Sequence, residues 1–258
     1  MNATVRKNNP SMLWEIEEYW SKRAQSYSEE VRFEMAHENE RNWMEVLQRY
    51  LQGIPGKKVL DIGTGPGFFA IGLAKRGYQV TAVDYTWNML EEARKNAGDL
   101  ADRIEFLQMD AQNLEFDDAS FDAVVTRNLT WNLERPGEAY REWHRVLKKG
   151  GVLLNFDAGW YNYLFDHEKA DSFEADRRRV KAAQIKDFES YAESDKMEDI
   201  SRRLILSRCE RPATDIELLR RAGFKLIYTD EEIGEQVWDE TEKLNYGSRP
   251  MFMLRGVK

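Results

Sequence analysis

The stretch Val59-Leu60-Asp61-Ile62-Gly63-Thr64-Gly65-Pro66-Gly67 decides the fold of this chain. A short apolar run that begins at Lys58 enters three glycines at alternate positions, which predicts a buried strand ending in a tight turn. Without β-carbons, the glycines let a ligand approach the backbone, and they adopt the positive φ angles that such a turn needs. Residues 68–76 then have a helical pattern closed by Gly77. The stretch therefore predicts a strand, a ligand-binding turn and a helix.

The alternation of strand and helix continues along the chain. Runs of apolar and β-branched residues predict six further strands, at 79–84, 104–108, 121–125, 152–156, 224–228 and 251–255. Helical patterns begin at Thr86, Glu138 and Asp215. Strands that alternate with helices predict an α/β fold: a doubly wound, mostly parallel, seven-stranded sheet with helices on both faces. Ligands bind such sheets at the carboxyl ends of the strands.

Two segments fall outside this alternation. Apolar side chains at helical spacing predict an N-terminal helical segment, residues 1–56. A long, charged stretch at 157–211 has a largely helical pattern, and we interpret it as an insertion after strand five that caps the ligand edge on the substrate side. Between them lies the predicted Rossmann-like core, residues 57–156. Residues 212–258 are expected to complete the sheet.

Composition argues against several classes of protein. The formal net charge of −8 disfavours binding to a nucleic-acid backbone, and the basic run 177–179 lies among acidic residues, as on a solvated helix face. One cysteine, Cys209, and no Cys/His cluster with ligand spacing predict neither a disulfide framework nor a metal site. No apolar run is long enough to span a bilayer, and residues 1–10 are polar. We therefore expect a cytoplasmic protein with no membrane segment.

An acidic residue, Asp84, ends the strand that follows the glycine turn. A carboxylate at this place can accept hydrogen bonds from both hydroxyls of a ribose. Nicotinamide-dependent enzymes also combine a glycine-rich first turn with an acid on strand two. Their glycines are spaced G-x-G-x-x-G, whereas this chain has G-x-G-x-G preceded by Asp61. The spacing makes an NAD-dependent oxidoreductase the less favoured alternative.

The segment 61–67, together with Asp84, resembles the first motif and the ribose-binding acid of the class I S-adenosylmethionine (SAM)-dependent methyltransferases. The resemblance extends to 107–111, 121–127 and 142–151, although the usual proline before the two glycines is Lys149 here. It implies SAM as the cofactor, S-adenosylhomocysteine (SAH) as its product, and a small molecule as the methyl acceptor. Methyl transfer is an in-line displacement, which depends on alignment and requires no metal. A SAM- or nucleoside-binding protein without catalysis is the alternative from another class.

The resemblance also implies roles by position. The backbone of Gly63 and Gly65 is expected near the methionine part of SAM, and Asp61 is expected to hold the loop or the amino group. Asp84 takes the ribose and Asp110 the adenine amino group. The full set of predicted cofactor-binding residues is Tyr19, Tyr27, Asp61, Gly63, Thr64, Gly65, Gly67, Asp84, Tyr85, Met89, Asp110, Ala111 and Arg127.

Three of these positions have an alternative interpretation. The segment from Tyr19 to Tyr27 is similar to the N-terminal segment that folds over bound cofactor in many members of the family, which makes residues 1–56 a helical lid. The two tyrosines could equally pack the first helix onto the body. Met89 is expected beside the adenine, and a core methionine on a helix is nearly as well supported.

Substrate contacts are expected after strand four and in the insertion. Asn128 and Trp131 occupy the place where the family has substrate-facing residues, and Trp160 begins the insertion. The sequence there departs from the Asn-Pro-Pro-aromatic pattern of enzymes that methylate bases or glutamine, which disfavours those substrates. Of the three histidines, His167 is the candidate general base because Asp157 and Asp166 are near it in sequence. No base is needed if the acceptor is a thiolate, a carboxylate or a neutral amine.

Overall fold

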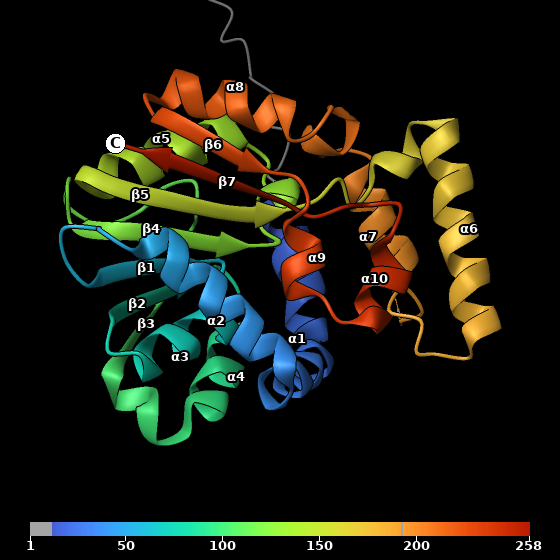
Figure 1. The fold of residues 1–258 in the computed structure, drawn as a ribbon, viewed down its shortest axis with the longest axis horizontal. Coiled ribbons are helices and arrows are strands. Elements are labelled where there is room, and N and C mark those ends of the chain that lie inside the picture. Colours follow the sequence, from blue (N-terminus) through green and yellow to red (C-terminus); the bar gives the residue numbers. More distant parts are fainter. Residues whose placement is uncertain (1–11, 192) are drawn as a thin grey trace, which may run out of the picture.

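A seven-stranded sheet forms the centre of the molecule (Figure 1), in a computed structural model that describes residues 12–191 and 193–258. The strand order is β3-β2-β1-β4-β5-β7-β6. β7 runs antiparallel to both of its neighbours, and the pairs among β1 to β5 are parallel. The strands are β1 (Lys58–Ile62), β2 (Gln79–Asp84), β3 (Ile104–Gln108), β4 (Phe121–Arg127), β5 (Leu147–Asp157), β6 (Lys225–Asp230) and β7 (Phe252–Val257). The predicted fold class is therefore confirmed.

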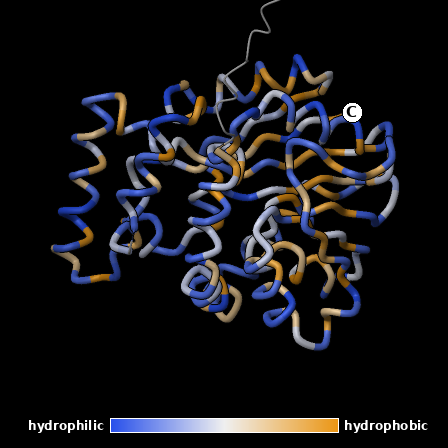
Figure 2. Tube along the Cα trace, turned by 180° about the vertical axis from the view of Figure 1, so that it is seen from behind, coloured by the Kyte–Doolittle hydropathy of each residue, from blue (hydrophilic) through white to orange (hydrophobic). Residues whose placement is uncertain are grey.

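Helices cover both faces of this sheet, and each layer buries its own hydrophobic cluster. One layer consists of α2 (Glu38–Leu51), α3 (Phe68–Lys75), α4 (Trp87–Ala97) and α9 (Ile233–Val237), and the other of α5 (Pro136–Val146) and α8 (Ala213–Ala222). Hydrophobic colours concentrate in the strands between the layers (Figure 2). Burial of this apolar surface is the main stabilising contribution to the fold.

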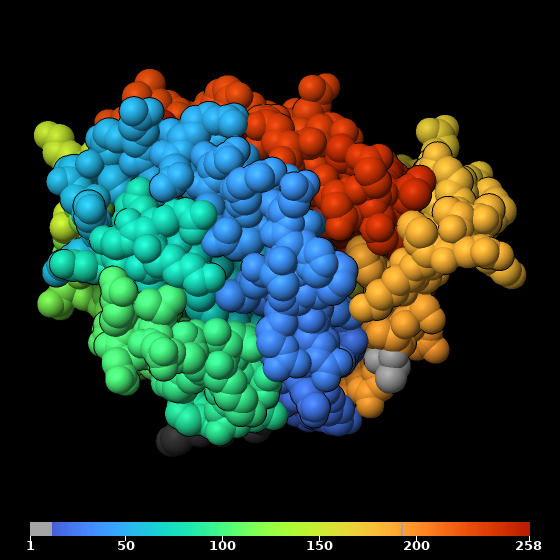
Figure 3. Space-filling view, turned by 60° about the horizontal axis from the view of Figure 1, so that its bottom comes forward, coloured from blue at the N-terminus to red at the C-terminus, as the bar shows by residue number. Residues whose placement is uncertain are grey.

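Four helices gather at the carboxyl ends of the parallel strands (Figure 1). They are α1 (Leu13–Ala36), α6 (His167–Ala183), α7 (Ser194–Ser201) and α10 (Glu240–Tyr246). In Figure 3, α1 lies between the α3–α4 side of the molecule and the yellow and orange residues of α6 and α7. Short 3-10 turns link the elements at η1 (Gly98–Arg103), η2 (Thr130–Asn132), η3 (Asn162–Leu164) and η4 (Leu206–Arg208). The helices α6 and α7 lie within the stretch 157–211 that was predicted as an insertion.

A buried ion-pair network fixes the C-terminal end of that stretch to the sheet. The Arg211 side chain is 1% exposed, and its guanidinium contacts the carboxylates of Asp215 at 2.8 Å and Asp157 at 3.3 Å. It also donates to the Thr130 hydroxyl at 2.6 Å. Tyr140 of α5 joins the network by donating to Asp215 at 2.7 Å. Arg211 thereby connects α8, the end of β5 and the turn after β4.

Several element boundaries differ from the sequence prediction. The strand predicted at 152–156 begins earlier, because β5 starts at Leu147 and includes residues 148–151. The ladder accommodates Gly150, with φ of 78°, through a shift in register between Phe121 and Ala123 of β4. The expected strand at 224–228 lies at Lys225–Asp230 in the structure. Among the described residues, no helix combines the length and the apolar character needed to cross a membrane.

Candidate functional site

The glycine turn after β1 has the backbone conformation that the sequence predicts. Gly63, Gly65 and Gly67 have φ angles of 66°, 51° and 94°. The amide of Gly65 donates to Asp84 Oδ2 at 2.9 Å, and Asp84 Oδ1 accepts from the Thr86 amide at 2.8 Å. Burial raises the pKa of Asp84 to about 6. The carboxylate of Asp84 thus joins the turns after β1 and β2 at the carboxyl edge of the sheet.

Asp61 stabilises the same turn through buried hydrogen bonds. Its side chain is 2% exposed and accepts hydrogen bonds from the Thr64 hydroxyl at 2.7 Å and the Ala70 amide at 3.0 Å. Burial raises the pKa of Asp61 to about 7. Of the two roles expected for Asp61, these contacts correspond to holding the loop. Asp61 and Thr64 line a small recess beside the turn, together with Tyr27 and Arg127.

A cleft of about 100 Å³ runs along the carboxyl ends of β1, β2 and β4. Asp110 lies at one end, where its Oδ1 accepts from the amide and the side chain of Gln112 at 2.9 and 3.1 Å. Trp20 and Tyr27 of α1 also line the cleft. The sequence-predicted residues that line it are Tyr27, Gly63, Gly65, Asp84, Tyr85, Met89, Asp110, Ala111, Arg127 and Asn128.

Three predicted site residues are packed against other parts of the protein and do not line a cavity of the site. Tyr19 is 1% exposed and lies in a hydrophobic cluster with Trp131, whose indole N–H donates to the carbonyl of Asn128 at 2.8 Å. Gly67 caps α3, and a β-carbon there would approach Ala93 of α4 to 3.2 Å. Tyr19, Trp131 and Gly67 therefore position the walls of the site and do not line its cavities.

His167 is also not brought to the site. It is the exposed first residue of α6 and lines none of the three cavities described here. The two acids near it in sequence are engaged elsewhere. Asp157 accepts from the Trp131 amide at 3.1 Å, and Asp166 caps α6 through the Glu168 amide at 2.9 Å. The expected general-base pair is therefore not formed.

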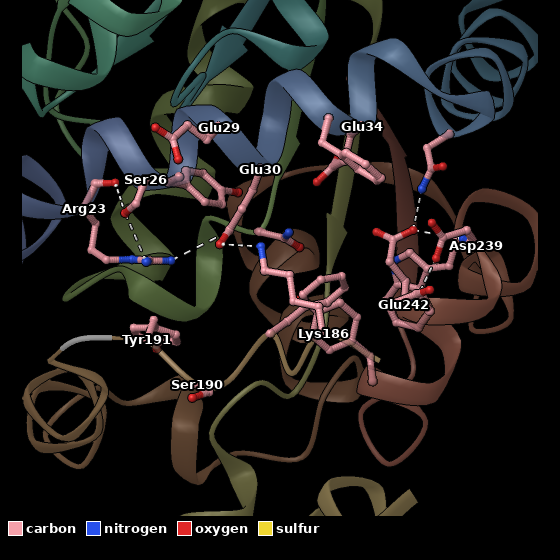
Figure 4. Close-up of a pocket in the computed structure, with 18 of the residues that line it drawn as sticks. Arg23, Ser26, Glu29, Glu30, Glu34, Lys186, Ser190, Tyr191, Asp239 and Glu242 are labelled. Atoms are coloured by element: carbon pink, nitrogen blue, oxygen red, sulfur yellow. Dashed lines mark hydrogen bonds and ion pairs between the residues drawn. The ribbon is translucent and has the colours of Figure 1, made fainter. Parts of the chain in front are cut away.

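A second, larger cavity of about 930 Å³ adjoins the cleft. Tyr27, Arg127 and Asn128 line both spaces and so mark their junction. Figure 4 shows α1 on one side of the cavity, the start of α10 on another, and the chain around Lys186 and Tyr191 below. Trp160, the third residue predicted to contact substrate, is in its wall.

The basic side chains that face this cavity already have acidic partners. Arg127 is paired with Glu34 at 2.7 Å and lies over the ring of Phe68, 4.2 Å from its centroid. Glu30 lies between Arg23 and Lys186, at 3.7 and 3.6 Å. These pairs leave α1 with little unbalanced charge toward the cavity.

Glu242 is a buried acidic residue of the same cavity. Its side chain comes from α10, is 8% exposed, and forms no ion pair within 4.0 Å among the described residues. One oxygen, Oε2, accepts from Asn39 Nδ2 at 2.6 Å and from the Asp239 amide at 3.0 Å. Burial, with a smaller contribution from the charge of Glu34, raises the pKa of Glu242 to about 8. A carboxyl group without a cationic partner therefore lies in the cavity wall.

The raised pKa predicts a pH dependence of stability. Because the folded protein holds the Glu242 proton more tightly than the unfolded chain, this residue makes the free energy of unfolding fall as pH rises from about 4.5 to about 8. We expect Glu242→Gln to remove that part of the slope. Urea unfolding of both proteins at pH 5 and pH 8 measures it. An identical slope in the two proteins would contradict the raised pKa.

Sequence reasoning missed several residues that line these cavities. Trp20 of α1 was quoted only as part of the segment resembling a lid, and Glu34 and Glu242 were not considered. A local signal existed for Glu242, because Asp239 and Glu242 have the spacing of a capping box, which the structure contains. That signal predicts the start of a helix and says nothing about a cavity. Among the described residues, no group of three or more acidic, His or Cys side chains could hold a metal ion.

Comparison with known proteins agrees with this fold. Residues 60–155 match a family model described as a methyltransferase domain. Residues 60–155, which contain the glycine turn and Asp84, thus have the sequence pattern of a methyltransferase domain.

Among the relatives, a demethylmenaquinone methyltransferase of Clavibacter sepedonicus is 40% identical over 117 residues, which are 45% of this chain and 47% of that protein. The chain thus matches about half the length of this curated relative. A phosphoethanolamine N-methyltransferase of Haemonchus contortus, solved with SAM, has a similar fold, with a TM-score of 0.56 and 20% identity over 84% of this chain and 52% of that one. The cyclase SpnF is comparable, with a TM-score of 0.56 and 18% identity over 85% and 80% of the two chains.

Proposed function

We propose that this protein is a SAM-dependent methyltransferase that acts on a small molecule. The observation that carries the proposal is the carboxylate of Asp84, held by the Gly65 amide at the edge of a cleft that opens toward a much larger cavity. Bound SAM would supply the methyl group, and the larger cavity would hold the acceptor. The junction at Asn128 and Arg127 is where the two would meet.

The residues of the cleft suit this cofactor. Asp84 can accept from the ribose hydroxyls and Asp110 from the adenine amino group. Gly65 leaves room for the ligand because, among the described residues, only Tyr27 lies within 4 Å of where its β-carbon would be. Arg127 is the one basic side chain among the described residues that line the cleft, and it is paired with Glu34. A sulfonium is favoured by such surroundings, whereas the pyrophosphate of NAD would need a free basic partner.

The residues that line the two cavities also suggest roles for the segments before and after the Rossmann-like core. We assign the described part of the predicted segment 1–56 as a lid, because Trp20 and Tyr27 of α1 line the cleft. Residues 1–11 of that segment lie outside the residues that the structure describes. We assign 157–211 as the cap on the substrate side, because Trp160, Lys186 and Tyr191 line the larger cavity. Residues 57–156 bind the cofactor, and 212–258 complete the sheet.

Of the residues that line the larger cavity, only Arg127 and Asn128 fall in the segment that matches the methyltransferase family. The acceptor is therefore to be inferred from this chain's own cavity.

The ribose role of Asp84 predicts a measurable loss. We expect Asp84→Ala to weaken SAH binding by more than ~1 kcal/mol, because charge-assisted hydrogen bonds are lost. Calorimetric titration with SAH measures the effect, with Asp84→Asn as a control that keeps an acceptor oxygen but not the charge. NAD should bind to none of the proteins. Unchanged SAH affinity in Asp84→Ala would remove Asp84 from the ribose role, and turnover of SAM with an acceptor separates an enzyme from a protein that only binds.

A further inference from the structure

We propose that the larger cavity binds an acceptor that carries a protonated amino group on a flat apolar body, with Glu242 as the counter-ion of the amine. The inference rests on the proposed function, since it names the substrate class of the same site. Three observations support it: the charges that line the cavity, the aromatic side chains that line it together with Glu242, and one buried hydrogen-bond acceptor atom at the junction with the cleft.

The charge balance of the cavity favours a cation. Six acidic and four basic side chains line it among the described residues. Arg23 and Lys186 share Glu30, Arg127 is held by Glu34, and Lys22 contacts Glu18 and Glu193. An anionic ligand would have to break one of these pairs. A cation can instead pair with Glu242, whose buried carboxyl group has no ion-pair partner among the described residues.

Aromatic rings complete the wall from which Glu242 projects. Tyr246, one helical turn further along α10, makes an edge contact with Trp160, with ring centroids 5.1 Å apart, and lies 5.4 Å from Trp238. Phe188 is 5.8 Å from the same tyrosine. Aromatic faces attract cations and also bury flat apolar groups. Glu242 and these rings line one cavity, which therefore offers both a carboxyl group and apolar surface to an amine attached to an apolar body.

The buried hydrogen-bond acceptor at the junction of the two cavities belongs to Asn128. Its side-chain oxygen Oδ1 is buried and has no hydrogen-bond partner among the described residues. The residue has a φ of 56°, a left-handed conformation that is uncommon for residues other than glycine and that recurs at functional sites. An N–H group of the ligand would satisfy this oxygen, which a carbonyl or carboxylate group of a ligand could not do.

Binding of an amine should be coupled to the release of a proton from Glu242. Because burial raises the pKa of Glu242 to about 8, its carboxyl group is mostly protonated at neutral pH and must release that proton to act as a counter-ion. The charged or titratable groups that face it are Glu34 of α1, Arg127 of β4, Asp239 at the start of α10, and Tyr246. Affinity for the amine should therefore rise by up to about tenfold per pH unit between about pH 6 and pH 8.

The experiment is calorimetric titration of the full chain saturated with SAH. The probes are two matched pairs, tryptamine with tryptophol and 2-phenylethylamine with 2-phenylethanol, in which an alcohol replaces the amine. We expect each amine to bind at least about tenfold more tightly than its alcohol. Glu242→Gln should abolish this preference and the pH dependence, while Glu29→Gln, which removes an exposed carboxylate from the same cavity, should keep both.

Several results would overturn the inference. Equal binding of amine and alcohol, a preference that survives in Glu242→Gln, or no binding of either amine to a protein that does bind SAH would each do so while leaving the proposed function intact. If SAH itself does not bind, the proposed function fails and the inference fails with it. Should Glu242→Gln not fold, the pH dependence of amine binding to the unmodified protein decides, and affinity that is flat from about pH 6 to pH 8 overturns the inference.

Discussion

A Gly65→Val variant is expected to lose SAM and SAH binding by more than about 100-fold while remaining folded. Gly65 has a φ of 51°, and its β-carbon position faces the open cleft 3.6 Å from the ring of Tyr27. A branched side chain would occupy the space through which a ligand reaches the Gly65 backbone and the Asp84 carboxylate. Left-handed φ at a non-glycine residue costs about 1–3 kcal/mol, which a domain of ordinary stability tolerates. Calorimetry with SAH and circular dichroism measure the two properties.

Gly53→Val is the matched control for backbone strain. Gly53, in the turn after α2, has a φ of 84°, and no atom of the other described residues lies within 4 Å of its β-carbon position. This variant should show a comparable loss of stability with normal SAH binding. Normal binding by Gly65→Val would contradict the assigned turn geometry. So would a Gly65→Val variant that is unfolded while Gly53→Val is folded.

Arg211→Met is expected to lower the free energy of unfolding by about 3–5 kcal/mol. The substitution keeps an apolar side chain of similar length but leaves Asp157 and Asp215 buried without a cation, since both carboxylates are 0% exposed. It also removes a donor to the Thr130 hydroxyl. Because this network fixes the end of β5 beside the larger cavity, the effect is expected on stability first. Urea denaturation monitored by tryptophan fluorescence gives the value.

The control for Arg211→Met is Arg221→Met on α8. Arg221 pairs with Glu217 at 2.9 Å, but the two side chains are 71% and 50% exposed. Pairs of this kind contribute little, so a change within about 0.5 kcal/mol is expected. If both variants lost the same small amount of stability, the buried network would not hold the end of β5 in the way described here.

The sheet and the cofactor cleft could be predicted from the sequence because their signals are local. Each strand is a short apolar run. The glycine turn follows β1, Asp84 ends β2, and Asp110 lies just beyond β3. Parallel pairing then brings the carboxyl ends of neighbouring strands together, which places those residues at one edge of the sheet. Spacing along the chain is therefore sufficient for this half of the site.

The larger cavity could not be predicted in this way. Its walls combine α1, the end of β4, the residues around Lys186 and the start of α10, and Asn39 meets Glu242 across 203 positions of sequence. Tyr19 and Tyr27 illustrate the limit on a single helix, since one is packed in a hydrophobic cluster and the other lines the cleft. The sequence pattern predicted the same role, a contact with the cofactor, for both tyrosines. The difference depends on the way α1 is rotated against the sheet.

The position of α1 also has a consequence for the two spaces of the site. The same helix supplies Trp20 and Tyr27 over the cleft and Arg23, Glu30 and Glu34 beside the larger cavity. A displacement of α1 would therefore change the cleft and the larger cavity together. A substitution on α1 is thus expected to affect both spaces, even where the altered side chain lines only one of them.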